Sequence, residues 1–423
     1  MDMDVIDLTE TDTECDTKSV DSVDIFAPYS PPHKTTTKSQ MPPLEAPCVP
    51  FPDLDALDAL DALEAKYNMS KIDFSHLREH GYQVIDMPVL THKECEDRIS
   101  EFWDWLESLG RGIKRNDPKT WMRQAWPANI HGIVQYPSAA HARPTWKIRS
   151  HHNVVNVFSQ LWQTPPEQMQ TSFDRVCIQR PTTRTMPQKP WLHMDQGARL
   201  RGERCVQGFV TLKDMPATGG TLVVMPGSHR LHEEFFDAFP DRVSIDVTDE
   251  ETGETKKKTF SDNWVKFTQD ELDWWKESGC EPVRISAKAG QLVLWDSRTV
   301  HQGSYPLPGS APQWRWVVYV CMKPTPTARD PASRKKLARA MQKKQEIFLE
   351  GATASHWPVP EKWQRRHKSG KVTEEWMGLK KFPAKPQYSR DQKPEPRDAD
   401  KIRTVEELRA ISPLAPVLAG FSK

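Results

Sequence analysis

A chain of 423 residues is long enough for two average domains or for one large domain with long tails. Its 36 prolines outnumber its 19 glycines and only 37% of its residues are hydrophobic, which favours one domain with tails outside the packed core. The net charge is zero, no apolar run reaches the roughly 18 residues that span a bilayer, and the acidic start MDMDVIDLTE argues against a basic targeting peptide.

The seven cysteines are scattered along the chain without a CxxC pair, which is typical of a reducing compartment. We therefore expect a soluble intracellular protein with no membrane span, and the sequence does not distinguish nucleus from cytoplasm.

Residues 1–70 carry 15 acidic and 4 basic side chains and little periodic hydrophobicity, so we expect an acidic disordered tail. Within it, Val5, Ile6 and Leu8 flank Asp7 and precede further acidic residues. This stretch resembles a SUMO-interacting motif, in which a disordered segment adds a strand to a sheet edge. SUMO is therefore an expected partner, and the alternative is a solvated acidic tail.

Residues 71–325 are expected to form the folded domain. The pattern predicts a short helix ending at Gly81, a strand at 82–86 and a helix capped by Thr91. From 173 to 322, short alternating strands broken by turns predict an antiparallel sandwich or jelly roll. The charged stretch 231–281 interrupts these strands, and we expect it to be an insertion in the form of an exposed hairpin or loop.

Residues 326–423 form a basic, proline-rich extension with a helix expected at about 332–349. The segment SHWPVP (355–360) is expected to wrap the core, since exposed tryptophans in a free tail would be unusual. The basic stretches lack aromatic residues interleaved on a recognised nucleic-acid fold, so nucleic-acid binding is not supported.

The stretch PWLHMDQG (190–197) contains the first candidate ligands. His193 and Asp195 are two residues apart, so both side chains point to the same face of a strand. His301, in VLWDSRTVHQG, lies at the end of another apolar strand of the same block. Two histidines and one carboxylate on neighbouring strands are typical of the facial triad that binds non-haem Fe(II) and leaves positions open for a co-substrate and dioxygen.

A buried arginine extends this hypothesis. Arg315 begins the strand RWVVYV, where period-two alternation places Arg315, Val317 and Tyr319 on one face. A guanidinium inside a barrel requires a partner, and its planar fork matches a carboxylate. The distal carboxylate of 2-oxoglutarate would provide that partner while its keto-acid end chelates the iron.

Together with the candidate ligands and Arg315, the sequence motifs show a family resemblance. About 60% of the chain, from Phe74 to Met322, resembles the phytanoyl-CoA dioxygenase family of Fe(II)/2-oxoglutarate oxygenases. The matching motifs are GYQVID, HMD, GGTLVVMPGSH and GQLVLWDSRTVHQG followed by an arginine strand. The resemblance implies a mainly β fold with flanking helices around a double-stranded β-helix, a cupin-like jelly roll. It also implies iron ligation by His193, Asp195 and His301, a co-substrate anchor at Arg315, and hydroxylation of a small organic or lipid-like substrate.

Several residues carry weaker expectations. Gln179 and Thr221 lie on strands that could line the co-substrate pocket. The insert YPLPGSAPQW (305–314) lengthens the gap between His301 and Arg315, which leaves Arg298 as the alternative anchor, although alternation turns it to the other face. His229 is interpreted as a structural turn residue. The histidines without a ligand partner at a recognisable spacing are assigned no metal role: His131, His141, His151, His152 and His356.

The sequence also allows a second functional hypothesis, in which the protein is not an enzyme. A chain with this fold could be a catalytically inactive interaction protein recruited through the amino-terminal Val5–Leu8 motif. Asp195 at the acidic ligand position, in place of glycine or alanine, argues against the halogenating variants of the family and in favour of hydroxylation.

Overall fold

The computed structural model describes residues 71–181, 191–248, 255–259, 263–327, 330–359, 395–397 and 399–421. The motif around Val5, Ile6 and Leu8 lies outside these residues. In the described part of the chain, no helix combines the length and the apolarity needed to cross a membrane.

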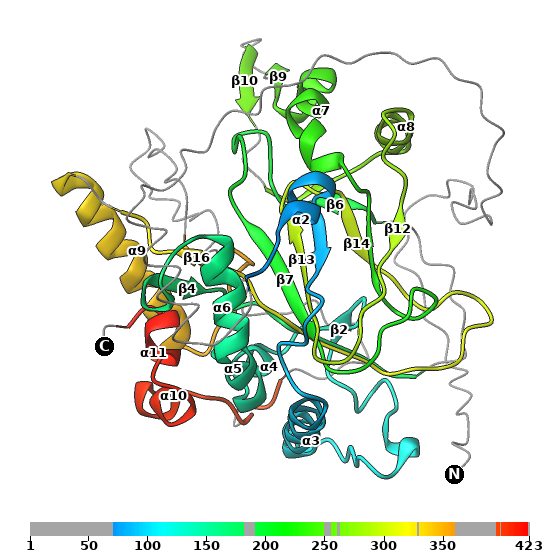
Figure 1. Cartoon of the computed structure of the whole chain (residues 1–423), viewed down its shortest axis with the longest axis vertical. Coiled ribbons are helices and arrows are strands. Elements are labelled where there is room, and N and C mark those ends of the chain that lie inside the picture. The colour runs from blue at the N-terminus through cyan, green and yellow to red at the C-terminus, as the bar shows by residue number, and fades with distance from the viewer. Residues whose placement is uncertain are drawn as a thin grey trace.

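Two antiparallel sheets form the centre of the fold, and their strands run side by side in Figure 1. The larger sheet has seven strands, in the order β1 (Tyr82–Val84), β13 (Leu292–Asp296), β7 (Val206–Thr211), β15 (Arg315–Tyr319), β5 (Val176–Gln179), β3 (Ile133–Val134) and β2 (Asn129–Ile130). The smaller sheet has five, in the order β11 (Val265–Lys266), β6 (His193–Met194), β14 (His301–Gly303), β8 (Leu222–Val224) and β12 (Val283–Arg284). The mainly β, jelly-roll architecture expected from the sequence is confirmed.

The sheets pack through side chains that alternate along their strands. One apolar cluster joins Phe209 and Trp295 of the larger sheet to Leu222 and Val224 of the smaller one. The opposite face of the larger sheet contributes Val210, Leu294 and other residues to a second cluster. Successive side chains of these strands thus point to opposite faces of the sheet, as the alternating sequence pattern predicts.

Helices cover the outer face of the larger sheet. The first is α3 (His92–Ser108), where Thr91 and Glu94 form a capping box and Phe102 and Leu106 are buried against the sheet. Preceding it, α2 (Ser75–His80) ends at Gly81, which has the left-handed φ of 81°. These are the helix limits that the sequence predicts. The other helical elements that precede β4 are η1 (Pro118–Thr120), α4 (Pro137–His141), α5 (Arg143–Arg149), α6 (His152–Leu161) and η2 (Pro166–Gln168).

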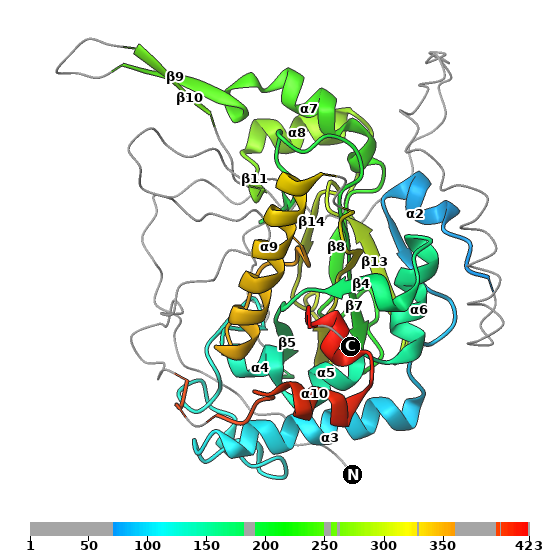
Figure 2. The same ribbon diagram turned by 90° about the vertical axis from the view of Figure 1, so that its left-hand side faces the viewer.

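The segment 231–281 is more than the exposed hairpin or loop expected from its charge. It follows η3 (Ser228–Leu231) and contains α7 (His232–Ala238), η4 (Pro240–Arg242), the hairpin β9 (Ser244–Thr248) and β10 (Thr255–Thr259), β11 and α8 (Gln269–Glu277). Only the hairpin projects outward (Figure 2). Phe235, Phe236 and Trp275 form a buried cluster with Met194 of β6, so the segment packs against the strand that carries His193.

The carboxy-terminal extension packs on one side of the sheets. It follows the two-stranded pair β4 (Met169–Thr171) and β16 (Met322–Pro324) and contains α9 (Pro331–Leu349), where a helix was expected at about 332–349, α10 (Val405–Ile411) and α11 (Ala415–Leu418). In Figure 1 these helices lie beside β4 and α5, and α11 contacts β4 while α10 contacts α5. Phe348 and Leu408 share a buried cluster with Trp146 of α5.

Candidate metal centre

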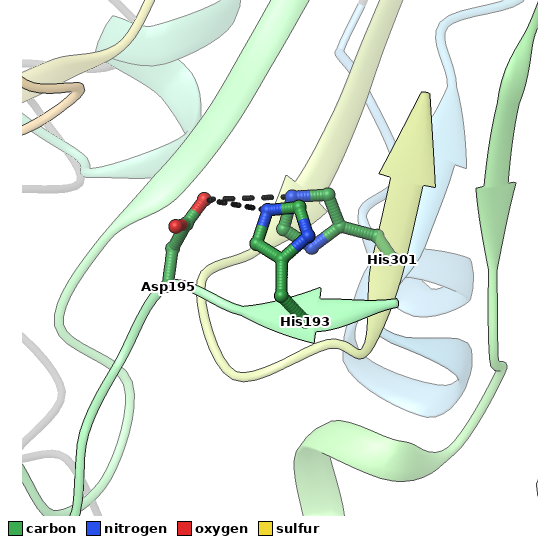
Figure 3. A group of neighbouring side chains, drawn as sticks. All are labelled: His193, Asp195 and His301. Carbon is green, nitrogen blue, oxygen red and sulfur yellow. Dashed lines mark ion pairs between the residues drawn. The ribbon is translucent and has the colours of Figure 1, made fainter. Parts of the chain in front are cut away.

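His193, Asp195 and His301 meet on the smaller sheet (Figure 3). His193 of β6 is the register partner of His301 of β14, so the two imidazoles stand side by side with ring centroids 4.4 Å apart. Asp195 follows β6, where its backbone N–H donates to the carbonyl of Ser297. Asp195 Oδ2 lies 3.8 Å from His193 Nε2 and 3.4 Å from His301 Nε2. One ligand atom from each residue lies within 4.8 Å of the others, a spacing that one metal ion can bridge.

Backbone carbonyls fix the orientation of both imidazoles. His193 Nδ1 lies 3.1 Å from the carbonyl oxygen of Trp191, and His301 Nδ1 lies 2.9 Å from that of Thr299. A carbonyl oxygen only accepts, so each Nδ1 carries a proton, and Nε2 is the ring nitrogen that faces Asp195. Burial, followed by the nearby His301, lowers the pKa of His193 to about 3, so this imidazole is neutral at pH 7, as metal binding requires.

The acidic ligand is held by a neighbouring strand. Gln207 of β7 donates from Nε2 to Asp195 Oδ2 at 3.0 Å. Burial alone would raise the pKa of Asp195, but His356, His193 and His301 together hold it well below its usual range. The site therefore offers two imidazole nitrogen atoms and one carboxylate, the donor set of a facial triad, and these residues fit an Fe(II) ion.

Arg315, at the start of β15, points into the fold. It is 4% exposed, its Cζ lies 5.6 Å from the centroid of the Phe209 ring, and its Nη1 donates to Cys177 Sγ at 3.4 Å. Among the described residues, neither Nε nor Nη2 has a hydrogen-bond partner. Arg315 opposes the rise in the pKa of Tyr319 that burial causes, as expected for two residues that share a face of β15. A buried guanidinium with two unused donors is suited to bind a carboxylate.

The guanidinium also lies close to the strand of His301. A methyl group built on Gly303, two residues after that histidine on β14, would lie 3.8 Å from Arg315 Nη1. The alternative anchor, Arg298, is engaged elsewhere, because its Nε and Nη2 donate to the two carboxylate oxygens of Asp296 at 3.0 and 2.6 Å. Between these two arginines, Arg315 is thus the one with donors left for a ligand.

The two weaker candidates are tied to the backbone. Gln179, the register partner of Arg315, donates from Nε2 to the carbonyl of His131 at 3.1 Å. Thr221 is fully buried, and its hydroxyl donates to the carbonyl of Ile285. Gln179 therefore lies beside the arginine that the sequence singled out, whereas the Thr221 proton is already used by the backbone.

Aromatic side chains surround His193. The Trp191 ring is stacked on it at a centroid distance of 4.7 Å, and His131 is stacked on the other side of Trp191 at 4.4 Å. Trp264, from the 231–281 segment, lies 5.8 Å from His193 and is 54% exposed. Trp264 is thus the exposed member of the aromatic group around His193.

Two neighbours of Asp195 were missed by sequence reasoning. Gln207 could have been found, because it lies on an apolar strand where a buried polar side chain needs a partner. His356 was assigned no metal role, yet its Nδ1 lies 4.0 Å from Asp195 Oδ2. The only signal for it was the expectation that SHWPVP wraps the core. His229, by contrast, contacts the carbonyl of Arg78 at 3.0 Å through Nε2, in keeping with a structural role.

Comparison with known proteins gives one family. The family model described as phytanoyl-CoA dioxygenase matches residues 77–305. The Ava biosynthesis cluster protein O of Aspergillus versicolor is 30% identical over 229 residues, which is 54% of this chain and 70% of that protein.

Two solved structures are similar at lower identity. The non-haem alpha-ketoglutarate-dependent carbocyclase SnoK of nogalamycin biosynthesis matches 64% of this chain and 91% of its own, with 19% identity and a TM-score of 0.37. The product of GlcNAc Inducible Gene 2 of Candida albicans matches 70% of this chain and 74% of its own, with 14% identity and a TM-score of 0.42.

Proposed function

Since this chain belongs to the phytanoyl-CoA dioxygenase family, we propose that it is an Fe(II)/2-oxoglutarate-dependent dioxygenase that hydroxylates a small organic or lipid-like molecule. The observation that carries the proposal is the convergence of His193, Asp195 and His301 on one face of a sheet, with both Nε2 atoms directed at the carboxylate.

The triad would hold iron through His193 Nε2, His301 Nε2 and an oxygen of Asp195. Bound iron supplies the oxidising chemistry, in which dioxygen converts 2-oxoglutarate to succinate and carbon dioxide and one oxygen atom enters a C–H bond of the substrate. The chain contributes the placement of the ligands. Trp191 and Thr299 fix the two imidazoles through their carbonyls, and Gln207 holds the carboxylate.

Arg315 would bind the distal carboxylate of 2-oxoglutarate. Its unused Nε and Nη2 match the two oxygens of a carboxylate, and Gly303 leaves space between Arg315 and the strand of His301. Gln179 would border the co-substrate through its position opposite Arg315, while Thr221 would contribute shape rather than a proton.

The substrate would approach along the aromatic side of the site. The exposed Trp264 and the Trp191 ring beside His193 offer apolar surface to a carbon skeleton and lack the charge that a strongly ionic substrate would need. The name of the Aspergillus versicolor relative, a biosynthesis cluster protein, supports a small-molecule substrate as well.

Turnover of the co-substrate tests the proposal without knowledge of the substrate. The protein is purified without oxygen, loaded with Fe(II) and exposed to dioxygen and 2-oxoglutarate, and succinate is measured. We expect succinate from the wild type and none above background from His193→Ala or Asp195→Ala. Asp214→Ala is the matched control, because this exposed carboxylate pairs with Lys288 on the surface.

Absence of succinate from the wild type, or equal succinate from the wild type and the triad variants, would contradict the enzymatic proposal. The first outcome, with the protein folded, would favour the inactive interaction protein recruited through Val5, Ile6 and Leu8. Binding of SUMO to a peptide of this motif, compared with the same peptide carrying alanine at the three positions, would then be the measurement to make.

A further inference from the structure

Residues 351–359, which we call the C-terminal strap, lie beyond the residues that the family model matches and are fixed along their length. The carbonyl of Ala352 accepts from His141 Nε2 at 2.8 Å, and the N–H of Ala354 donates to the carbonyl of Phe173 at 3.1 Å. The carbonyl of Pro358 accepts from Lys344 Nζ at 3.2 Å. The strap is therefore part of the packed structure.

Lys344 strengthens this attachment. Its side chain comes from α9, is 1% exposed, and also donates to the carbonyl of Thr171 on β4 at 2.6 Å. A buried amino group requires such acceptors, so α9, β4 and the strap depend on each other. Trp357 completes the anchoring, since it is 2% exposed and packs against Cys205 and Cys321 at the ends of the strands that flank the site.

The strap brings His356 to the candidate metal centre. Its side chain is 13% exposed, and its Nδ1 lies 4.0 Å from Oδ2 of Asp195, the same oxygen to which Gln207 donates. Within the described residues, its other ring nitrogen, Nε2, is buried and has no hydrogen-bond partner. A ring confined by Trp357 next to a ligand carboxylate restricts the positions that the carboxylate can adopt.

We propose that the C-terminal strap is an integral part of the metal centre and that His356 is a positioning residue for Asp195. This inference rests on the proposed function, because it takes the triad to be a metal site. At 4.0 Å an N–H on Nδ1 acts on the carboxylate through its dipole, and the ring excludes conformers in which Asp195 turns away from the two imidazoles. His356 and Gln207 thus both act on Oδ2 of the acidic ligand, His356 from the C-terminal strap and Gln207 from β7.

Metal binding tests this inference apart from turnover. Metal-free, full-length protein is titrated with Co(II), and both the dissociation constant and the visible absorption spectrum of the bound ion are recorded. Removal of a residue that orients a metal ligand typically weakens metal binding by about 10- to 100-fold. We expect a loss of this size for His356→Ala, together with a changed Co(II) spectrum.

Two further variants separate the side chain from the packing. Asparagine places an amide nitrogen near the position of Nδ1, so His356→Asn should recover most of the affinity. Trp357→Phe keeps an aromatic ring in the anchor and leaves His356 in place, so it should bind Co(II) as the wild type does. Where His356→Ala does not fold, His356→Leu replaces it in the comparison with asparagine, because leucine fills the space without a donor.

The possible results differ for the two proposals. If the wild type binds no Co(II), the metal centre itself is wrong. If the wild type binds Co(II) and His356→Ala binds it with the same affinity and spectrum, the positioning role of His356 is overturned while the metal centre stands. Equal losses in His356→Ala and His356→Asn would also overturn it, because the recovered donor would have had no effect.

Discussion

Replacement of Arg315 by methionine separates the binding of co-substrate from the binding of metal. The structure gives the guanidinium two donors, Nε and Nη2, that no described residue uses. A hydrogen bond between charged groups contributes about 1.5 kcal/mol or more, so two such bonds to a carboxylate contribute about 3 kcal/mol. At about 1.4 kcal/mol for each factor of ten, Arg315→Met should weaken 2-oxoglutarate binding about 100-fold.

The same substitution should not destabilise the protein when co-substrate is absent. In that state the wild type buries a cation whose donors are only partly satisfied, and the loss of this unfavourable burial should raise the free energy of unfolding by about 1 kcal/mol. Lower co-substrate affinity combined with equal or higher stability is a pattern that general damage to the fold does not produce.

Calorimetric titration with 2-oxoglutarate measures the affinity, and urea unfolding measures the stability. Arg298→Met is the matched control, because this guanidinium is bonded to Asp296. It should leave 2-oxoglutarate affinity unchanged and lower the free energy of unfolding by about 3 kcal/mol, since the buried Asp296 carboxylate loses its partner. Unchanged 2-oxoglutarate affinity in Arg315→Met would refute the role assigned to Arg315.

Three further predictions follow from side chains around the core. Gln207→Leu should weaken Co(II) binding about 10-fold, because Asp195 loses its hydrogen-bond donor, and unaltered affinity in a calorimetric titration would contradict this. Phe235→Ala should lower the free energy of unfolding in urea by about 3 kcal/mol, since the 231–281 segment has a packed core, whereas a loss under about 0.5 kcal/mol would mean that it has none. Burial lowers the pKa of His141 to about 3 in the folded protein. Between pH 6.5 and pH 3 the unfolded chain therefore binds a proton at this residue that the folded chain does not. As a result, the free energy of unfolding falls with falling pH, by up to about 1.4 kcal/mol per pH unit. His141→Gln, which keeps a donor for Ala352, should flatten this dependence in urea titrations at pH 7 and pH 5.5, and an unchanged slope would exclude His141 as its source.

The triad was predictable because its geometry is local to two short stretches. His193 and Asp195 are two residues apart, which predicts a shared face, although Asp195 lies just after the two-residue strand β6. His301, expected at the end of the apolar strand, instead begins β14 in the smaller sheet, opposite His193. The helix cap at Thr91 and the helix end at Gly81 are equally local, and both formed as expected.

The predictions fell short where the outcome depends on distant packing. In 231–281, charged residues obscure the spacing of Phe235 and Trp275, so the two helices around the hairpin were not anticipated. His356 comes after the last matching strand, and no spacing rule relates it to Asp195. Its position follows from α9 and from the buried Lys344, which are properties of the assembled fold.

The shortness of β6 has a consequence for how the protein assembles. This strand has only two residues, and His193 pairs with His301 on one side and Lys266 on the other. A slip of one residue would turn His193 to the opposite face and leave no site, so metal can be captured only after β6 has found its register. Once bound, the ion would link β6 to β14, two strands that share a single register pair, and would hold that register against slippage.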